Sequence, residues 1–201
     1  MNYAIILSGG IGSRMNKIDI PKQYIKVQGK PLIMYTLEQF EKSKEIDNIV
    51  VVASNEWKQY IKDECREHGI SKILDIVING RTRQESIYNG LKKCIQSSSN
   101  IEDKVIIHDA VRPMVTVELI EKCLNNIGEY DGCMPVLPLN DTIYYSDNGE
   151  EITNLMDRSK LYAGQAPEAF NLYKYYAINE NTSKEELNKI RGTSECKINS
   201  W

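Results

Sequence analysis

Short apolar runs alternate with amphipathic stretches along the first two thirds of the chain. The runs are rich in β-branched residues, and unbroken runs of this kind are typical of strands buried on both faces of a parallel sheet. The stretches between them repeat apolar residues every three to four positions, as a helix with one buried face does. The predicted strands are 3–7, 49–52, 73–78 and 104–108, and the predicted helices are 31–43, 56–68, 84–95 and 117–124. This alternation predicts an α/β domain with a mostly parallel sheet and right-handed connections.

The rhythm changes after residue 136. Segments 141–145 and 152–153 flank the turn signal Asp147-Asn148-Gly149, which predicts a β-hairpin arm over about 137–163. The apolar side of a protruding arm has to be buried. Its partner is either the domain itself or a second copy of the chain in a symmetric dimer.

The segment after the arm has a different character. Residues 158–170 contain Gly164, Gln165 and Pro167, which predict an irregular but ordered segment rather than a helix. An aromatic helix face is expected over 172–177, and a capping box at Ser183 predicts the start of another short helix.

The first predicted strand leads into a glycine-rich loop, Ser8-Gly9-Gly10-Ile11-Gly12-Ser13-Arg14. Its glycines let backbone N–H groups approach a ligand, and a nest of such groups binds anions such as phosphate. Arg14, and Lys22 directly after Pro21, add positive charge that suits phosphate oxygens. The alternative is a glycine-rich turn with two solvated cations. Because the spacing fits neither the dinucleotide-binding fingerprint nor the P-loop, the loop predicts binding of a nucleoside triphosphate.

Two further loops at the ends of predicted strands carry charge. Residues 79–86 open a helix with Arg81 and Arg83 in the turn, which predicts an anion or base-recognition site. Residues 108–113 follow another strand, at the end of the sheet where open α/β proteins bind ligands. Asp109 there offers a carboxylate for Mg²⁺ on a triphosphate. The alternative is that Asp109 only pairs with Arg112 in a surface loop.

Composition narrows the functional classes. At 201 residues the chain predicts a single domain, and its net charge of −3 gives no global basic surface for nucleic acid. No apolar run approaches the length of a membrane span, and the N-terminus has no signal-peptide pattern. The five cysteines are scattered and lack a CxxC pair, which predicts reduced thiols in a cytoplasmic protein without a zinc site.

Six segments occur together in an order that resembles one enzyme family. They are 7–15, 21–24, 80–86, 108–113, 141–142 and 158–170. The chain is similar over almost its whole length to the cytidylyltransferases that make CDP-alcohols from CTP and a phosphorylated polyol, such as methylerythritol phosphate or ribitol phosphate. The resemblance implies a Rossmann-like α/β/α sandwich in one nucleotidyltransferase domain over 1–201, and a homodimer joined through the hairpin arm.

The resemblance also implies roles for individual residues on the nucleotide side. Backbone of the first loop would hold the phosphates and ribose of CTP, two cations would stabilise the charge that develops at the α-phosphate, and the second loop would read cytosine. The residues are Ser8, Gly9, Gly10 and Gly12 for the backbone, Arg14 and Lys22 for the charge, Gly80, Arg83 and Ser86 for the cytosine, and Ala110 for the ribose.

On the acceptor side, the resemblance implies that Asp109 coordinates Mg²⁺ or orients the acceptor, with Arg112 nearby. Thr142 and Arg158, reaching over from the partner subunit, would grip the acceptor phosphate. That phosphate would attack the α-phosphorus of CTP in line, and positioning and charge stabilisation suffice for such a step. A phosphate nucleophile is ionised near neutral pH, so no general base is needed and His108 is assigned a structural role.

Two departures from the family pattern modify these expectations. The family has Thr-Pro-Gln where this chain has Ala166-Pro167-Glu168, and a carboxylate near an acceptor phosphate repels it unless the carboxylate points away or pairs. The family also continues with a strand and a helix, including an active-site lysine, after the region of 192–195. A chain that ends at Trp201 is therefore expected to bind CTP but to turn over poorly.

The sequence leaves alternatives for the identity of the acceptor and for the presence of catalytic activity. The first loop and Tyr162-Ala163-Gly164-Gln165 favour ribitol 5-phosphate, or a related polyol phosphate, over methylerythritol 4-phosphate. A different acceptor also fits the altered segment at Ala166. The rival from another class is a catalytically silent nucleotide-binding or dimer-forming module.

Overall fold

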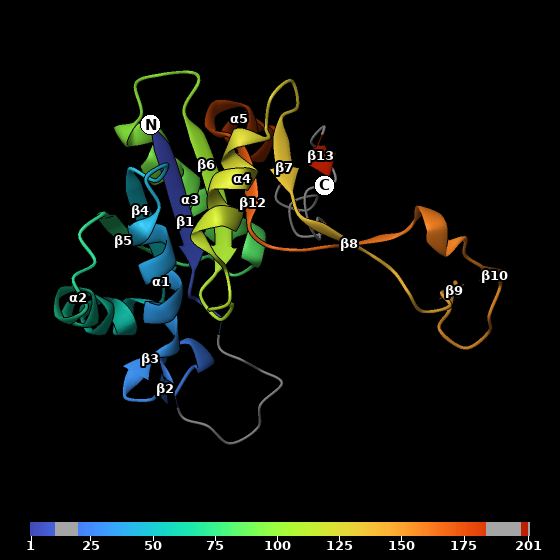
Figure 1. The fold of residues 1–201 in the computed structure, drawn as a ribbon, viewed down its shortest axis with the longest axis horizontal. Helices are drawn as coiled ribbons and strands as arrows, with labels where there is room; N and C mark the ends of the chain where they lie inside the picture. Colours follow the sequence, from blue (N-terminus) through green and yellow to red (C-terminus); the bar gives the residue numbers. More distant parts are fainter. Residues whose placement is uncertain (11–19, 184–197, 201) are drawn as a thin grey trace.

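The computed structural model describes residues 1–10, 20–183 and 198–200, and its centre is a seven-stranded sheet in the order β13-β7-β12-β6-β1-β4-β5 (Figure 1). The strands are β1 (Asn2–Leu7), β4 (Asn48–Ala53), β5 (Ile73–Ile78), β6 (Lys104–Asp109), β7 (Gly132–Met134), β12 (Glu168–Asn171) and β13 (Ile198–Ser200). The strands β6, β1, β4 and β5 run parallel, whereas β12 runs antiparallel to both of its neighbours. The predicted α/β class with a mostly parallel sheet is confirmed.

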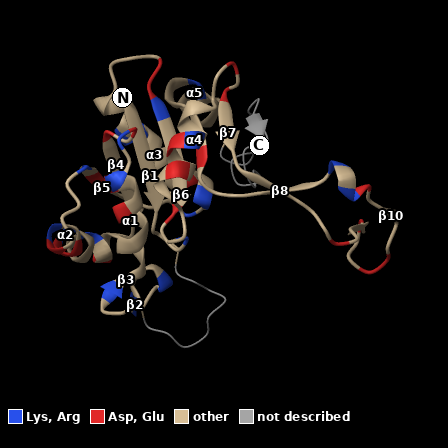
Figure 2. Cartoon of the chain, viewed as in Figure 1, with Lys and Arg blue, Asp and Glu red and all other residues tan. Residues whose placement is uncertain are grey.

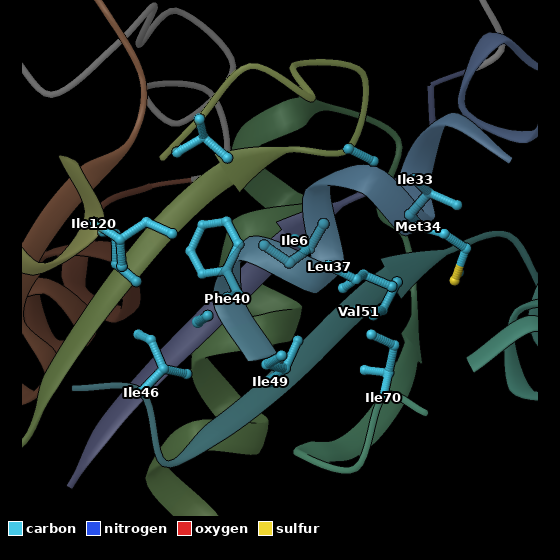
Figure 3. Packing of buried hydrophobic residues seen from close by; sticks show 14 of the residues in the cluster. Ile6, Ile33, Met34, Leu37, Phe40, Ile46, Ile49, Val51, Ile70 and Ile120 are labelled. Atoms are coloured by element: carbon cyan, nitrogen blue, oxygen red, sulfur yellow. The ribbon is translucent and has the colours of Figure 1, made fainter. Parts of the chain in front are cut away.

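Helices cover both faces of this sheet. They are α1 (Leu32–Lys42), α2 (Lys58–Glu67), α3 (Arg83–Ser97), α4 (Val117–Asn125) and α5 (Leu172–Asn181). Alternation along β1 sends Ala4 and Ile6 into a core shared with α1, α2 and α4. Tyr3 and Ile5 enter a second core with α3 and α5. Figure 3 shows the first core, in which the apolar side of α1 packs onto the strands through Leu37.

The predicted helices are present with small changes at their ends. A 3-10 turn, η2 (Asn55–Trp57), precedes α2, so the α-helix begins two residues later than the apolar pattern predicts. The helix α3 begins one residue earlier, because Thr82 is its N-cap and accepts a hydrogen bond from the Glu85 backbone N–H. Two short elements, η1 (Lys22–Tyr24) and the hairpin β2 (Lys26–Val27) with β3 (Lys30–Pro31), lie between β1 and α1.

The segment 158–170, expected to be irregular, contains a strand of the central sheet. It begins with η3 (Arg158–Lys160) and β11 (Tyr162–Gly164), and it ends in β12, which inserts between β6 and β7. Ala169 and Phe170 are fully buried there. The strand has four residues, and its pairing partners are distant in the chain, so its local pattern is too short to predict it.

A hairpin arm extends away from the sheet domain (Figure 1). Its base is β8 (Val136–Pro138) paired with β11, and its tip is β9 (Tyr144–Tyr145) paired with β10 (Asn154–Leu155). The second tip strand begins two residues after the predicted one, because the Asn148 side chain accepts from the backbone of Glu150 and Glu151 and widens the turn. Within the described ranges, no helix is long and apolar enough to cross a membrane.

Candidate active site

A cavity of about 690 Å³ lies at the carboxyl ends of β1, β5 and β6. Its walls come from the loop after β1, the residues Lys22 and Gln23, the loop between β5 and α3, and the end of β6. Parallel strands bring their carboxyl ends to one edge of the sheet, where open α/β proteins bind ligands. The fold therefore brings together the three loops in which the sequence predicts chemistry.

The segment Pro21 to Tyr24 fixes the backbone of the first loop. The Gln23 amide donates to the carbonyl oxygens of Ser8 (2.6 Å) and Gly10 (3.1 Å). The Tyr24 hydroxyl lies 2.9 Å from the Ser8 hydroxyl, and its ring stacks on Trp57 with the ring centroids 4.3 Å apart. Burial raises the pKa of Tyr24, so its phenol stays a neutral hydrogen-bonding group. Two buried side chains thus hold the described part of the loop, Ser8 to Gly10, and Lys22 and Gln23 both line the cavity.

Lys22 is half-buried and borders the cavity. No carboxylate among the described residues pairs with its ammonium group. The chain therefore presents a cation beside the glycine-rich backbone of Ser8 to Gly10, which is the arrangement that an anionic ligand requires. Gly12 and Arg14, predicted for the same loop, lie outside the described residues.

The second loop is packed against the first. A Cβ atom on Gly9 would lie 2.4 Å from Cβ of Asn79, so only glycine allows this approach. The Gly80 backbone N–H donates to the Ser86 hydroxyl (3.0 Å), which in turn donates to the Thr82 carbonyl (2.9 Å). The loop at the N-terminus of α3 is thus braced by its own side chains, and the helix end favours negative charge.

Four charged side chains form a chain of ion pairs at the edge of the cavity. Nη2 of Arg83 is 3.0 Å from Oε1 of Glu168, and Nε of Arg83 is 3.8 Å from Oδ1 of Asp109. Nε of Arg112 is 3.0 Å from Oδ2 of Asp109. The surface pair of Asp109 and Arg112 that the sequence left as an alternative is therefore present, and its carboxylate also borders the cavity.

Asp109 is suited to share a cation with a bound ligand. Its Oδ1 atom has only the long contact with Arg83, beyond hydrogen-bonding distance, so it keeps acceptor capacity. Over the described ranges, no group of three or more His, Cys, Asp or Glu side chains gathers at metal-binding distance. A divalent cation here would therefore take most of its ligands from phosphate oxygens and water, which is the usual arrangement for Mg²⁺ on nucleotides.

His108 is not among the residues that line the cavity. It is 1% exposed, its Nε2 atom is 3.0 Å from the Arg112 carbonyl oxygen, and its ring lies 5.5 Å from that of Phe40. Burial lowers the pKa of His108, so the ring is neutral near pH 7. These contacts hold the loop that carries Asp109 and Arg112, in keeping with the structural role predicted for His108.

Comparisons with known proteins identify the family to which the chain belongs. Residues 2–196 match the family model described as "IspD: 2-C-methyl-D-erythritol 4-phosphate cytidylyltransferase". The chain belongs to this family.

Curated relatives carry two different substrate names. The chain is 37% identical to a ribitol-5-phosphate cytidylyltransferase of Vibrio parahaemolyticus, over 86% of this chain and 72% of the relative. It is 35% identical to a 2-C-methyl-D-erythritol 4-phosphate cytidylyltransferase of Lachnospira eligens, over 85% of this chain and 73% of the relative. The predicted family resemblance is confirmed.

Solved structures agree with the fold. The crystal structure of 4-diphosphocytidyl-2C-methyl-D-erythritol synthase from Anaerococcus prevotii superposes with a TM-score of 0.75 at 28% identity. The alignment covers 96% of this chain and 78% of that one. The Rossmann-like form of the predicted fold is thereby confirmed for this IspD-family chain.

The structure brings most of the predicted nucleotide-side residues to one cavity. Those that line it are Ser8, Gly9, Gly10, Lys22, Gly80, Arg83 and Ser86. Asp109, predicted for the acceptor side and for Mg²⁺, lines the same cavity, whereas Arg112 does not. Ala110 is fully buried, and both of its backbone polar atoms are bonded within the protein. Its N–H donates to the Leu7 carbonyl oxygen, and its own carbonyl oxygen accepts from the Thr36 hydroxyl. Its contact with a ribose stays a prediction.

The predicted acceptor residues of the arm lie apart from the cavity. Thr142 and Arg158 are exposed, and Arg158 donates to the Asn140 carbonyl oxygen at 2.6 Å. Neither residue lines the cavity of its own chain. The expectation that each arm serves the site of a second subunit stays a prediction.

Sequence reasoning did not single out Gln23, Asn79 and Val111, although each stands in a segment that it recognised, 21–24, 79–86 and 108–113. The segments were therefore a usable signal for all three residues. The contact of Asn79 with Gly9, a residue 70 positions earlier in the chain, could not be predicted. Contacts of that kind depend on the register of the sheet, which the local pattern does not contain.

Proposed function

We propose that the protein transfers CMP from CTP to a phosphorylated polyol, giving a CDP-alcohol and pyrophosphate. The observation that supports this proposal most directly is a cavity lined by Lys22, by Ser8 to Gly10 and by residues of the loop 79–86. The chain also belongs to the cytidylyltransferase family. Ribitol 5-phosphate is the proposed acceptor. The alternative acceptor is 2-C-methyl-D-erythritol 4-phosphate, which the family model and one of the relatives name.

The two loops divide the recognition of CTP. The braced loop of Gly80 and Ser86 presents fixed backbone and hydroxyl groups, which suit the polar edge of a base. The first loop and Lys22 present N–H groups and a cation, which suit the triphosphate. Because Gln23 and Tyr24 hold the backbone at Ser8, and Ser86 braces the loop 79–82, these described parts of the site are pre-organised and need little ordering on binding.

The reaction needs no protein nucleophile. An oxygen of the acceptor phosphate attacks the α-phosphorus of CTP, a new P–O bond forms, and the bond to the pyrophosphate leaving group breaks. Negative charge shifts onto the oxygens around the α-phosphorus and onto the leaving group. We propose that Lys22, which lines the cavity, stabilises that charge together with Arg14 of the first loop.

Mg²⁺ is part of the proposal. Asp109 would hold it through the carboxylate oxygen that has no close partner. A bound Mg²⁺ neutralises triphosphate charge and keeps the phosphates in one conformation. The protein's own contribution is to fix Asp109 between Arg83 and Arg112, so that the carboxylate stands at the cavity edge.

The acceptor end requires a second subunit in this proposal. The arm leaves a set of large apolar side chains exposed, and a monomer rarely keeps such a surface in water. They are Leu137, Tyr144, Tyr145, Ile152, Leu155 and Tyr162. We propose that two arms pack together in a homodimer, and that Thr142 and Arg158 of each arm bind the acceptor phosphate in the partner's site.

We also propose a cytoplasmic location. The four described cysteines are free thiols, and all four are buried. Reduced thiols are typical of proteins in a reducing compartment.

Pyrophosphate release tests this function. The chain is assayed with CTP, Mg²⁺ and a panel that contains ribitol 5-phosphate, methylerythritol 4-phosphate and other polyol phosphates, with ATP, GTP and UTP as controls. We expect release with CTP alone among the nucleotides, and fastest with ribitol 5-phosphate. Faster release with methylerythritol 4-phosphate would select the alternative acceptor. CTP binding without release on any acceptor would leave only the nucleotide-binding module.

A further inference from the structure

Glu168 connects the strand β12 with the start of the helix α3. It is the first residue of β12, and Arg83, the first residue of α3, donates to its Oε1 atom at 3.0 Å. The Glu168 side chain is only 12% exposed, and it does not line the cavity itself. Its link to the cavity runs through Arg83, which does line it.

The next residue of α3 is held by the same unit. Gln84 is buried, and its amide donates to the Asn179 side chain (2.5 Å) and to the Tyr175 hydroxyl (3.3 Å), both on α5. Asn179 in turn donates to the Tyr175 carbonyl oxygen. Because α5 follows β12 directly, the β12–α5 unit holds the first two residues of α3 from behind the cavity.

The loop in front of α3 depends on where that helix begins. Thr82 is the N-cap of α3, and the bonds of Gly80 to Ser86 and of Ser86 to Thr82 tie the loop to the first helical turn. A shift of Arg83 therefore moves the groups that border the cavity at Gly80 and Ser86.

The buried position of the Glu168 carboxylate carries an energetic cost. Its Oε2 atom is buried and has no hydrogen-bond partner among the described residues. Burial raises the pKa of this carboxyl, and the neighbouring Arg83 guanidinium only partly offsets that effect. An apolar side chain would fill the same space without the penalty of a buried carboxylate. What the carboxylate supplies instead is a fixed anchor for Arg83.

We propose that Glu168 is a positioning residue of the nucleotide-binding loop: by holding Arg83 against β12, it fixes the start of α3 and with it the loop 79–82. The ligand in this inference, CTP, rests on the proposed function, whereas the geometry does not depend on it. Arg83 then serves as a structural cation. Among the described residues that border the cavity, Lys22 and Arg81 remain as cations without a carboxylate partner for the phosphates.

Three variants test the proposal. Glu168→Ala removes the anchor, and Glu168→Gln keeps a carbonyl oxygen that can accept from Arg83. Lys174→Ala is the matched control, because it breaks an ion pair of α5 with Asp131 (2.8 Å) on an exposed surface away from the cavity. The measurements are backbone hydrogen exchange over residues 79–90, the dissociation constant for CTP by calorimetry, and kcat against KM.

With Glu168→Ala we expect faster exchange over 79–90 and CTP binding weakened about 10-fold, as the loss of a buried charge-assisted bond implies. We expect kcat at saturating CTP to change less than KM. Glu168→Gln should stay within about 3-fold of the parent chain, and Lys174→Ala should match it.

Unchanged exchange and affinity in Glu168→Ala would contradict the proposal, and so would a Glu168→Gln variant as weak as Glu168→Ala. If Glu168→Ala does not fold, hydrogen exchange and CTP binding of Glu168→Gln decide the matter. If the parent chain does not bind CTP, the proposed function fails, while hydrogen exchange in the free protein still tests whether Glu168 fixes the loop.

Discussion

At the scale of single residues, the proposed mechanism depends most on Lys22, a cation that has no carboxylate partner among the described residues. Lys22 borders the cavity beside the glycine-rich backbone, and buried neighbours on its own segment hold it there. The charge is therefore free to meet the phosphates. An exposed lysine elsewhere on the surface has neither a glycine-rich backbone beside it nor buried neighbours that hold it in place.

Replacing Lys22 with alanine should lower kcat at least 100-fold, because a cation at the reacting phosphate contributes several kcal/mol to transition-state stabilisation. Thermal unfolding should be nearly unchanged, since the side chain makes no ion pair with the described residues. Lys62→Ala, on the exposed side of α2, is the control and should keep full turnover. Turnover of Lys22→Ala within a few fold of the parent would remove Lys22 from the mechanism.

Gly9 and Gly10 provide a second contrast at this scale. A Cβ atom on Gly9 would meet Asn79 at 2.4 Å, whereas one on Gly10 would have no atom within 4 Å. Gly9→Ala should therefore destabilise the fold by about 1–3 kcal/mol through overcrowding, and Gly10→Ala by much less. Thermal denaturation of the two variants measures the difference. Equal melting temperatures would show that the two loops can move apart at little cost.

The residues that carry charge in the site could be predicted from the sequence, because arginine, lysine and aspartate at the ends of strands have a recognisable chemistry. Lys22, Arg83 and Asp109 are examples, and all three border the cavity. Supporting residues could not be predicted in the same way. The pairing of Arg83 with Glu168 joins residues 85 positions apart, and it exists only because β12 inserts beside β6.

At the scale of elements, Glu41 fastens the end of α1 to the segment that leads into β5. The Ser71 hydroxyl and the Lys72 backbone N–H both donate to its carboxylate. Partial burial pushes the pKa of Glu41 up, but the hydrogen bonds from Ser71 and Lys72 outweigh burial, so its pKa lies below the ordinary value. The ionised carboxylate therefore stabilises the folded state.

This gives a pH prediction with a definite sign. A carboxyl group whose pKa is lower in the folded state adds stability above its unfolded pKa of about 4.5, and that stability is lost as the pH falls through the folded value. Glu41→Gln should lower stability by about 1 kcal/mol at pH 7. The difference from the parent chain should shrink as the pH is lowered below about 4.5. Melting temperatures over pH 3–8 measure it, and a difference that grows towards acid would contradict the assignment.

The elements themselves show where local pattern suffices. The strands β1, β4 and β6 were predictable because each is an apolar run buried on both faces, and β5 because it is an apolar run at the edge of the sheet. The helices between them have one apolar side. The strand β12 was missed because four residues next to glycine and proline carry no period. Antiparallel insertion between β6 and β7 is decided by distant partners, not by the segment itself.

At the scale of the whole molecule, the residues of the proposed site lie on two separate parts of the chain, the sheet domain and the arm. The cavity lies in the sheet domain, while Thr142 and Arg158 lie on the arm that extends from it (Figure 1). Figure 2 shows positive and negative segments interspersed over the domain and the arm, so the described part of this view has no continuous basic face. The exposed apolar side chains of the arm are the stronger signal, and they favour a second copy as the partner.

Mixing two inactive variants tests the shared site. Lys22→Ala removes the cation of its own cavity, and Arg158→Ala removes the proposed acceptor contact in the partner's cavity. In a random mixture of exchanged dimers, about a quarter of the sites would carry both groups intact, so activity should return to about that fraction. Sedimentation should show a dimer throughout. A monomer, or a dimer whose mixture stays inactive, would place Arg158 outside the partner's site.

The transfer itself can be followed with an isotope. Ribitol 5-phosphate labelled with ¹⁸O in its phosphate is incubated with the protein, CTP and Mg²⁺, and the products are analysed by mass spectrometry. Because an acceptor oxygen attacks the α-phosphorus of CTP, all of the label should appear in the CDP-alcohol and none in the pyrophosphate. Label in pyrophosphate, or the absence of any CDP-alcohol while CTP still binds, would contradict the account.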